Sequence, residues 1–248
     1  MKMKKQSNYY LVALAAAFML ASASFSASAL PSLQLDIVDG VYDNDSESIV
    51  TNANQFSLVA YGLDGSIDIN DDYFISIAVT PQIGPVLVDF GSFEFGGNTY
   101  DMNSMVYGRP PVENTSFMQN GGAHDLAPHG IYPTLYAEYA FNFAANQTAA
   151  AVNTQDVTGS DPLSNTGSAL YYMLFDVDIS NLLGGFELHF DLYNTAVQRR
   201  STDIDVDDFA PFSHDAATLP EPAPLVLLGL GMLLVVFTSG RKKLWVNN

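Results

Sequence analysis

The stretch Phe186-Glu187-Leu188-His189-Phe190-Asp191-Leu192-Tyr193 alternates apolar and polar residues over its whole length. Successive side chains of a β-strand point to opposite faces of a sheet, so this alternation predicts a half-buried strand. We expect its apolar residues to face a core. The other set, Glu187, His189, Asp191 and Tyr193, is expected to face outward.

Similar runs recur along the chain, and turn-forming residues separate them. They predict strands at residues 33–37, 41–42, 48–50, 56–61, 73–79, 135–143 and 170–179, and a hairpin over 93–100. Residues 144–167 are small and polar and predict a flexible loop, with an edge strand at 149–153 as the alternative. No helical period is visible between residues 30 and 217. Short strands in this number predict an all-β fold, a single β-sandwich domain of jelly-roll-like type.

The segment from Asp101 to Pro133 interrupts this pattern, because it lacks periodicity and is rich in proline and glycine. It predicts a long loop, and long ordered loops often carry function. Within it, Tyr107 and Arg109 combine an aromatic ring with a rare cation, so we expect them to contact a ligand such as an extracellular polysaccharide. The alternative is a lid that packs over an open end of the sheet.

The N-terminus carries Lys2, Lys4 and Lys5, then an apolar run over 9–20, then Ala27-Ser28-Ala29. A basic region, a short apolar region and a small-x-small site are typical of a secretory signal peptide. Residues 1–29 are therefore predicted to be removed on export, which leaves the sandwich domain over 30–217.

Residues 218–248 form a tail with three parts in a fixed order. Pro220-Glu221-Pro222 comes first, an apolar run over 223–237 follows, and Arg241-Lys242-Lys243 comes after it. The apolar run is near the lower limit for a transmembrane helix, and the basic cluster predicts a cytoplasmic end. The two prolines keep the segment before the helix extended, a shape that a processing enzyme can bind.

This tail resembles the PEP-CTERM sorting signal of Gram-negative bacteria. The resemblance implies cleavage by an exosortase-type enzyme, transient anchoring in the inner membrane, and a final place in the cell envelope or the extracellular matrix, in association with exopolysaccharide. One departure from the family pattern is that residues 244–248 extend past the basic cluster.

The body resembles the choice-of-anchor N proteins, which are exported bacterial domains with different C-terminal anchors. Three segments carry the resemblance: His129-Gly130-Ile131-Tyr132-Pro133-Thr134, Leu188-His189-Phe190-Asp191-Leu192-Tyr193-Asn194 and Ala210-Pro211-Phe212-Ser213-His214-Asp215-Ala216. That family has no established biochemical activity. The resemblance therefore supports export and leaves the function open.

The composition of the body restricts its partners. Between residues 30 and 219 there are 26 acidic residues and three arginines, Arg109, Arg199 and Arg200, which leaves a formal charge of −23. Such a surface repels nucleic acid and anionic lipid and attracts divalent cations. The chain also has no cysteine, so disulfides cannot stabilise it.

Clustered carboxylates make calcium the first candidate ion, because calcium takes six to eight oxygen ligands in irregular geometry. The candidate groups are Asp43, Asp45 and Glu47; Asp68, Asn70, Asp71 and Asp72; and Asp203, Asp205, Asp207 and Asp208. None has the spacing of an EF-hand. The alternative is a solvated acidic surface that keeps an exported protein soluble.

The histidines give weaker signals. His124 and His129 share the long loop with Asp125, whereas His189 and His214 lie elsewhere, and this scatter does not define a zinc motif. Ser213-His214-Asp215 has the residue types of a catalytic triad. Adjacent side chains of an extended segment point apart, however, and cannot form a relay.

No other pattern indicates catalysis, so we expect no catalytic residues. The sequence therefore predicts an exported, non-enzymatic protein of the cell envelope or matrix. A calcium-dependent carbohydrate-binding module is the first alternative, and a polysaccharide-processing enzyme is a more distant one.

Overall fold

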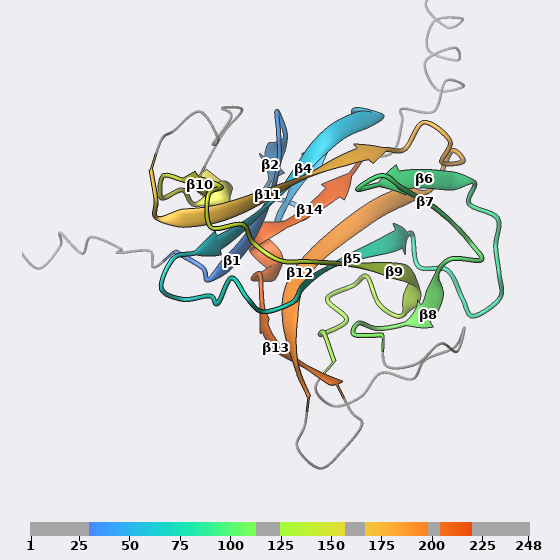
Figure 1. The fold of residues 1–248 in the computed structure, drawn as a ribbon. Helices are drawn as coiled ribbons and strands as arrows, with labels where there is room; N and C mark the ends of the chain where they lie inside the picture. Colours follow the sequence, from blue (N-terminus) through green and yellow to red (C-terminus); the bar gives the residue numbers. More distant parts are fainter. Residues whose placement is uncertain (1–29, 113–124, 157–166, 198–203, 220–248) are drawn as a thin grey trace, which may run out of the picture. The chain divides into compact units, whose positions relative to one another are not determined.

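The computed structural model describes residues 30–112, 125–156, 167–197 and 204–219, which form two β-sheets packed as a sandwich (Figure 1). No α-helix occurs among these residues. The strands are β1 (Leu33–Ile37), β2 (Val41–Asp43), β3 (Ser48–Thr51), β4 (Gln55–Leu63), β5 (Tyr73–Thr80), β6 (Ser92–Phe95), β7 (Asn98–Asp101), β8 (Val106–Gly108), β9 (Thr134–Phe141), β10 (Thr148–Ala149), β11 (Leu170–Asp178), β12 (Glu187–Val197), β13 (Ile204–Phe209) and β14 (Asp215–Thr218). Two short 3-10 turns are η1 (Thr154–Asp156) and η3 (Phe212–His214).

The first sheet has the strand order β1-β4-β11-β6-β7, with β10 also paired to β11. The second has the order β2-β3-β14-β12-β5-β9-β8, with β13 also paired to β12. Neighbouring strands are antiparallel, except that β14 runs parallel to β3. The last described strand, β14, therefore lies inside the second sheet, between β3 and β12.

The main core lies between the sheets, and β12 contributes Leu188, Phe190 and Leu192 to it. The ring of Phe190 meets the edge of Phe56 at 6.2 Å and stacks near Phe95 at 6.0 Å, measured between ring centroids. Phe56 and Phe95 belong to the opposite sheet. The apolar residues of this strand thus face the core as the alternation predicts.

The outer face of β12 differs from the prediction, because His189, Asp191 and Tyr193 are buried as well, with exposed fractions of 5%, 2% and 0%. Residues 125–133 cover this face. Leu126 and Tyr132 from this segment pack with residues of β5 and β9 in a second, smaller core. These side chains thus lie on the outer face as predicted, but the prediction of a half-buried strand is wrong, because this face is covered.

Most predicted strands occur, with ends that differ by one to four residues, but β8, β13 and β14 were not predicted from the sequence. β8 lies within the stretch predicted as one long loop. β13 and β14 are rich in aspartate and alanine, which have low strand propensity. Their pairing with β12 holds them extended, so neighbouring strands outweigh local preference.

Within the described ranges, no helix is long and apolar enough to cross a membrane. The predicted signal peptide (1–29) and the residues of the predicted sorting signal from Pro220 onward lie outside these ranges.

Replacing Phe190 by Ala should lower the free energy of unfolding by about 3–5 kcal/mol, because it removes a ring that contacts both sheets. Urea denaturation followed by circular dichroism measures the change. Leu174→Ala is the matched control, since Leu174 is 41% exposed and its replacement should cost about 0.5 kcal/mol. Equal losses in the two variants would contradict the assigned core.

Candidate metal centre

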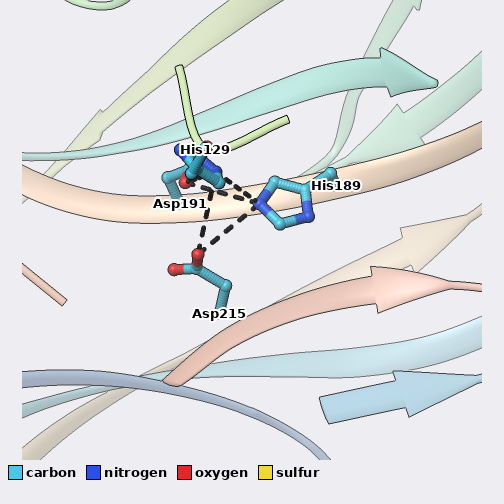
Figure 2. A group of neighbouring side chains, drawn as sticks. All are labelled: His129, His189, Asp191 and Asp215. Atoms are coloured by element: carbon cyan, nitrogen blue, oxygen red, sulfur yellow. Dashed lines mark hydrogen bonds and ion pairs between the residues drawn. The ribbon is translucent and has the colours of Figure 1, made fainter. Parts of the chain in front are cut away.

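Four side chains from three separate segments converge on the outer face of β12 (Figure 2). His189 and Asp191 come from β12, His129 precedes β9, and Asp215 begins β14. One ligand-type atom from each lies within 4.8 Å of all the others. No other three or more His, Cys, Asp or Glu side chains in the described part of the chain come together in this way.

The strand period explains the pairing of His189 with Asp191. Residues two apart on a strand share a face, so both side chains lie on the outer face of β12. Asp215 reaches the same place because β14 is the neighbour of β12 in the sheet.

His129 is positioned by the backbone of its own turn and by aromatic packing. Its φ angle is 29° and that of Gly130 is 88°, a left-handed pair that reverses the chain before β9. The imidazole ring stacks on Phe212 from the turn η3, with 4.0 Å between the ring centroids. This packing holds the ring over β12.

The ligand atoms are close to one another. His129 Nε2 lies 3.1 Å from Asp191 Oδ1 and 3.2 Å from His189 Nε2, and His189 Nε2 lies 3.4 Å from Asp191 Oδ1. Asp215 Oδ2 is further away, at 3.6 Å from His189 Nε2 and 3.9 Å from His129 Nε2. Ligand atoms about 2.0–2.1 Å from a tetrahedral zinc ion are separated by about 3.3–3.4 Å, which matches the first three distances.

Hydrogen bonds outside the cluster orient two of its members. His129 Nδ1 lies 2.7 Å from the Ala127 carbonyl oxygen, to which it can donate, leaving the Nε2 lone pair directed inward. Asp191 Oδ2 accepts hydrogen bonds from Tyr132 Oη at 2.6 Å and Ser76 Oγ at 3.0 Å. Such outer partners are typical of metal ligands, because they fix the tautomer and the direction of the ligating atom.

Three carboxylate oxygens of the cluster are buried and have no hydrogen-bond partner outside the cluster: Asp191 Oδ1 and both oxygens of Asp215. Buried polar atoms in native proteins are almost always paired, and an unpaired carboxylate oxygen is costly. These oxygens share the site with two imidazole nitrogens. A cation between them would supply the missing interactions.

The carboxylates and imidazoles of the cluster shift one another's pKa values. Burial alone would lower the pKa of His189, but the charges and hydrogen bonds of Asp191 and Asp215 outweigh it and raise this pKa to about 10. The pKa of His129 is also raised, since Asp191 outweighs the effect of burial. Burial would raise the pKa of Asp191, but the two histidines hold it well below its usual range.

Asp215 behaves differently from Asp191, although both are buried. Burial and the charge of Asp191 raise its pKa to about 7, despite the opposing effect of the histidines. Without a metal ion, protons therefore hold the cluster together. A metal would have to displace the protons from the imidazoles, as is usual for histidine sites.

A cavity of about 400 Å³ adjoins the cluster, and His129, His189 and Asp215 form part of its wall. The rest of the wall is apolar and acidic. It consists of Val50, Ile131, Phe212, Ala217 and Leu219, the carboxylates Asp43, Glu47 and Glu187, and the polar residues Ser46, Ser48, Thr80 and Thr218. The cavity beside the centre is thus lined by several carboxylates.

The acidic groups proposed from the sequence as calcium sites do not gather in the described residues. Asp43 accepts hydrogen bonds from the backbone N–H groups of Asp45 and Ser46, so its carboxylate closes its own turn. Glu47 lines the cavity beside Asp43. Asp68 forms a similar turn with Asn70.

The third acidic group lies on a strand. Asp205, Asp207 and Asp208 belong to β13, while Asp203 lies outside the described residues. Strand alternation places Asp208 on the face opposite Asp205 and Asp207, so the three aspartates do not converge on one point.

Tyr107 and Arg109, predicted to contact a ligand, lie in and just after β8 and are both partly buried. The Tyr107 ring packs against the main core, and the Arg109 carbonyl accepts a hydrogen bond from Tyr136 Oη at 2.8 Å. This packing agrees with the alternative in which the loop covers the sheet. The cover lies over the outer face and not over an open end.

Ser213 and His214 lie in the 3-10 turn η3, not in an extended segment, and Ser213 Oγ is 3.0 Å from His214 Nδ1. His214 Nε2 lies 2.7 Å from Asn153 Oδ1. Asp215 points instead into the cluster with His129 and His189. The three neighbours are therefore divided between two places. His124, the remaining histidine, lies outside the described residues.

Comparisons with known proteins do not assign this site. No protein-family model matches the chain, and no curated protein sequence is similar to it. Among solved structures, the crystal structure of a point mutant of the CFA/I adhesin CfaE from enterotoxigenic E. coli is similar at a TM-score of 0.22 and 9% identity. That match covers 77% of this chain and 49% of the adhesin, so the chain spans about half of that protein. A likeness this weak carries no argument about function.

Replacing Tyr132 by Phe should lower the free energy of unfolding of the metal-free protein by about 1.5–3 kcal/mol, because the buried Asp191 loses a charge-assisted hydrogen bond. Urea denaturation in excess EDTA measures it. Tyr136→Phe is the control. Its hydroxyl donates to a neutral carbonyl, and we expect a loss of about 1 kcal/mol. A loss for Tyr132→Phe no larger than that of the control would contradict the assigned role of Tyr132.

Proposed function

We propose that this protein is an exported metal-binding protein whose β-sandwich holds one transition-metal ion, of the zinc class, through His129, His189, Asp191 and Asp215. The observation that carries the proposal is the convergence on one point of two imidazole nitrogens and three buried carboxylate oxygens that have no partner outside the cluster. A metal ion with a preference for mixed nitrogen and oxygen ligands would contact these side chains together.

Ligand chemistry favours zinc over calcium at this centre. Calcium takes oxygen ligands in large numbers, whereas imidazole nitrogen suits zinc, copper, iron and nickel. Zinc also accepts a four-coordinate tetrahedral arrangement, which is the number of side chains present. The function supported best is therefore the binding of zinc or a similar ion outside the cytoplasm.

A metal ion at this centre would also stabilise the fold. Exported domains often gain stability from disulfides, which this chain cannot form. A metal here would join β12, the segment before β9, and the final strand β14. Because it binds the folded state, its binding energy adds to the free energy of folding.

The test is the zinc content of the exported protein after chelator treatment and dialysis against buffered zinc. Wild type should hold about one zinc per chain, and His189→Ala should hold none, because it loses an imidazole ligand. His214→Ala is the matched control, since His214 is a buried histidine whose described partners are Ser213 and Asn153. It should bind zinc as the wild type does.

A thermal or urea unfolding series with the same three proteins gives an independent readout. Zinc at 100 times its dissociation constant should stabilise the wild type and His214→Ala by about 2.7 kcal/mol. The unfolding of His189→Ala should not respond. Zinc content that is zero in the wild type, or equal in the wild type and His189→Ala, would contradict the proposal.

The place of action is proposed from the two ends of the sequence. We infer export through residues 1–29, transient membrane anchoring through a helix in 218–248, and processing there by an exosortase-type enzyme. The resemblances to PEP-CTERM and choice-of-anchor N proteins support this, as does the acidic body. A jelly-roll-like arrangement, a role in the exopolysaccharide matrix, calcium at the acidic groups and glycan contact at Tyr107 and Arg109 stay predictions.

Replacing Pro220, Glu221 and Pro222 together by Ala should leave uncleaved precursor in the membrane, because the segment loses both its motif and its extended shape. Mass spectrometry of the released and membrane fractions measures it. Asn247→Ala, which changes the same tail outside the motif, is the control and should be processed normally. A released wild-type protein that still contains the peptide with Trp245 would contradict processing.

A further inference from the structure

The four side chains of the centre are not equivalent, and three of them form a tighter set. His129, His189 and Asp191 have ligand atoms separated by 3.1–3.4 Å. Two of these three are also fixed by hydrogen bonds to residues outside the cluster. His129 can donate to the Ala127 carbonyl, and Asp191 accepts from Tyr132. A metal held by this set would have three well-oriented ligands.

The fourth side chain, Asp215, lies further from the other ligand atoms. Its Oδ2 lies 3.6 and 3.9 Å from the two imidazole nitrogens, and neither of its oxygens has a hydrogen-bond partner outside the cluster. Both distances exceed the separation of about 3.3–3.4 Å that is expected between two ligand atoms of a tetrahedral zinc ion.

Asp215 also lies beside the cavity, although its side chain is only 1% exposed. Asp215, His129 and His189 line the cavity of about 400 Å³, whereas Asp191 is not part of its wall. Three protein ligands and one exchangeable position are the arrangement of zinc sites that accept an outside molecule. The cavity gives that molecule room beside the metal.

We propose that Asp215 is an exchangeable fourth ligand and that the metal takes a small nitrogen-donor ligand, an imidazole or a primary amine, from the cavity. The inference rests on the metal site proposed above. The lining selects the class of ligand. Asp43, Glu47 and Glu187 repel anionic ligands and so favour a neutral nitrogen donor, while Val50, Ile131, Phe212 and Leu219 accept an apolar body.

Cobalt(II) in place of zinc makes the inference measurable, because its visible spectrum reports a change of ligand. Adding imidazole to the cobalt-loaded full chain should change the spectrum in a saturable way. The change should saturate at lower imidazole concentration in Asp215→Ala, since the competing carboxylate is gone. Asp205→Ala is the control, because Asp205 is an aspartate on β13 outside the cavity lining. It should behave as the wild type does.

Metal content separates this inference from the proposed function. Asp215→Ala should retain about one cobalt per chain at saturating metal, with weaker affinity, because three ligands remain. Loss of metal in Asp215→Ala, as complete as in His189→Ala, would make Asp215 an essential ligand and overturn the inference while leaving the metal site standing. Absence of cobalt from the wild type would instead overturn the proposed function.

The acidic wall has its own test with thiocyanate, an anionic ligand of cobalt. Glu187→Gln should strengthen thiocyanate binding about threefold, because the removed charge repels the anion, and should change the affinity for neutral imidazole less. A wild-type spectrum that responds to neither imidazole nor thiocyanate would show a closed centre and overturn the inference. Equal changes for both ligands in Glu187→Gln would overturn the selection by charge.

Discussion

The arrangement of this protein depends on one electrostatic constraint: electron-rich atoms meet in a place that water hardly reaches. Asp191 and Asp215 have side chains only 2% and 1% exposed, and two imidazole nitrogens lie beside them. Carboxylates in such surroundings are costly unless a cation neutralises them. Protons on the histidines meet part of this need, and a bound metal would meet it more fully, because it also reaches the oxygens that have no hydrogen-bond partner outside the cluster.

The cover of β12 serves this constraint as well as hydrophobic packing. The main core lies on one face of β12, and the segment 125–133 forms a smaller apolar core on the other face of the same sheet. The same segment brings His129 over β12 and Tyr132 within 2.6 Å of Asp191. The site thus joins chain segments that lie 60 residues apart, from His129 to His189. In a chain without cysteine, such a link has the place that a disulfide often occupies.

Much of the fold follows from the sequence, and the metal centre does not. Alternation along β9 and β12 predicted these strands, and the β-branched and aromatic residues of β5 predicted that one, since both are local properties. The alternation also placed His189 on the outer face of β12. A local pattern cannot reveal that a distant loop covers this face. His129 lies in an irregular turn, and Asp215 begins a strand of four residues with little apolar character. The pairing of His189 with Asp191 at a spacing of two was the one local signal, and it gained meaning only from the strands and the loop around it.

Extended X-ray absorption at the zinc edge of the zinc-loaded protein tests the central claim most directly, because it reports the ligands around the metal itself. The account predicts a first shell of nitrogen and oxygen atoms at about 2.0–2.2 Å, with the outer-shell scattering of two imidazole rings. His189→Ala would lose this signal. A shell of oxygen atoms without imidazole scattering would place the metal on surface carboxylates and contradict the account.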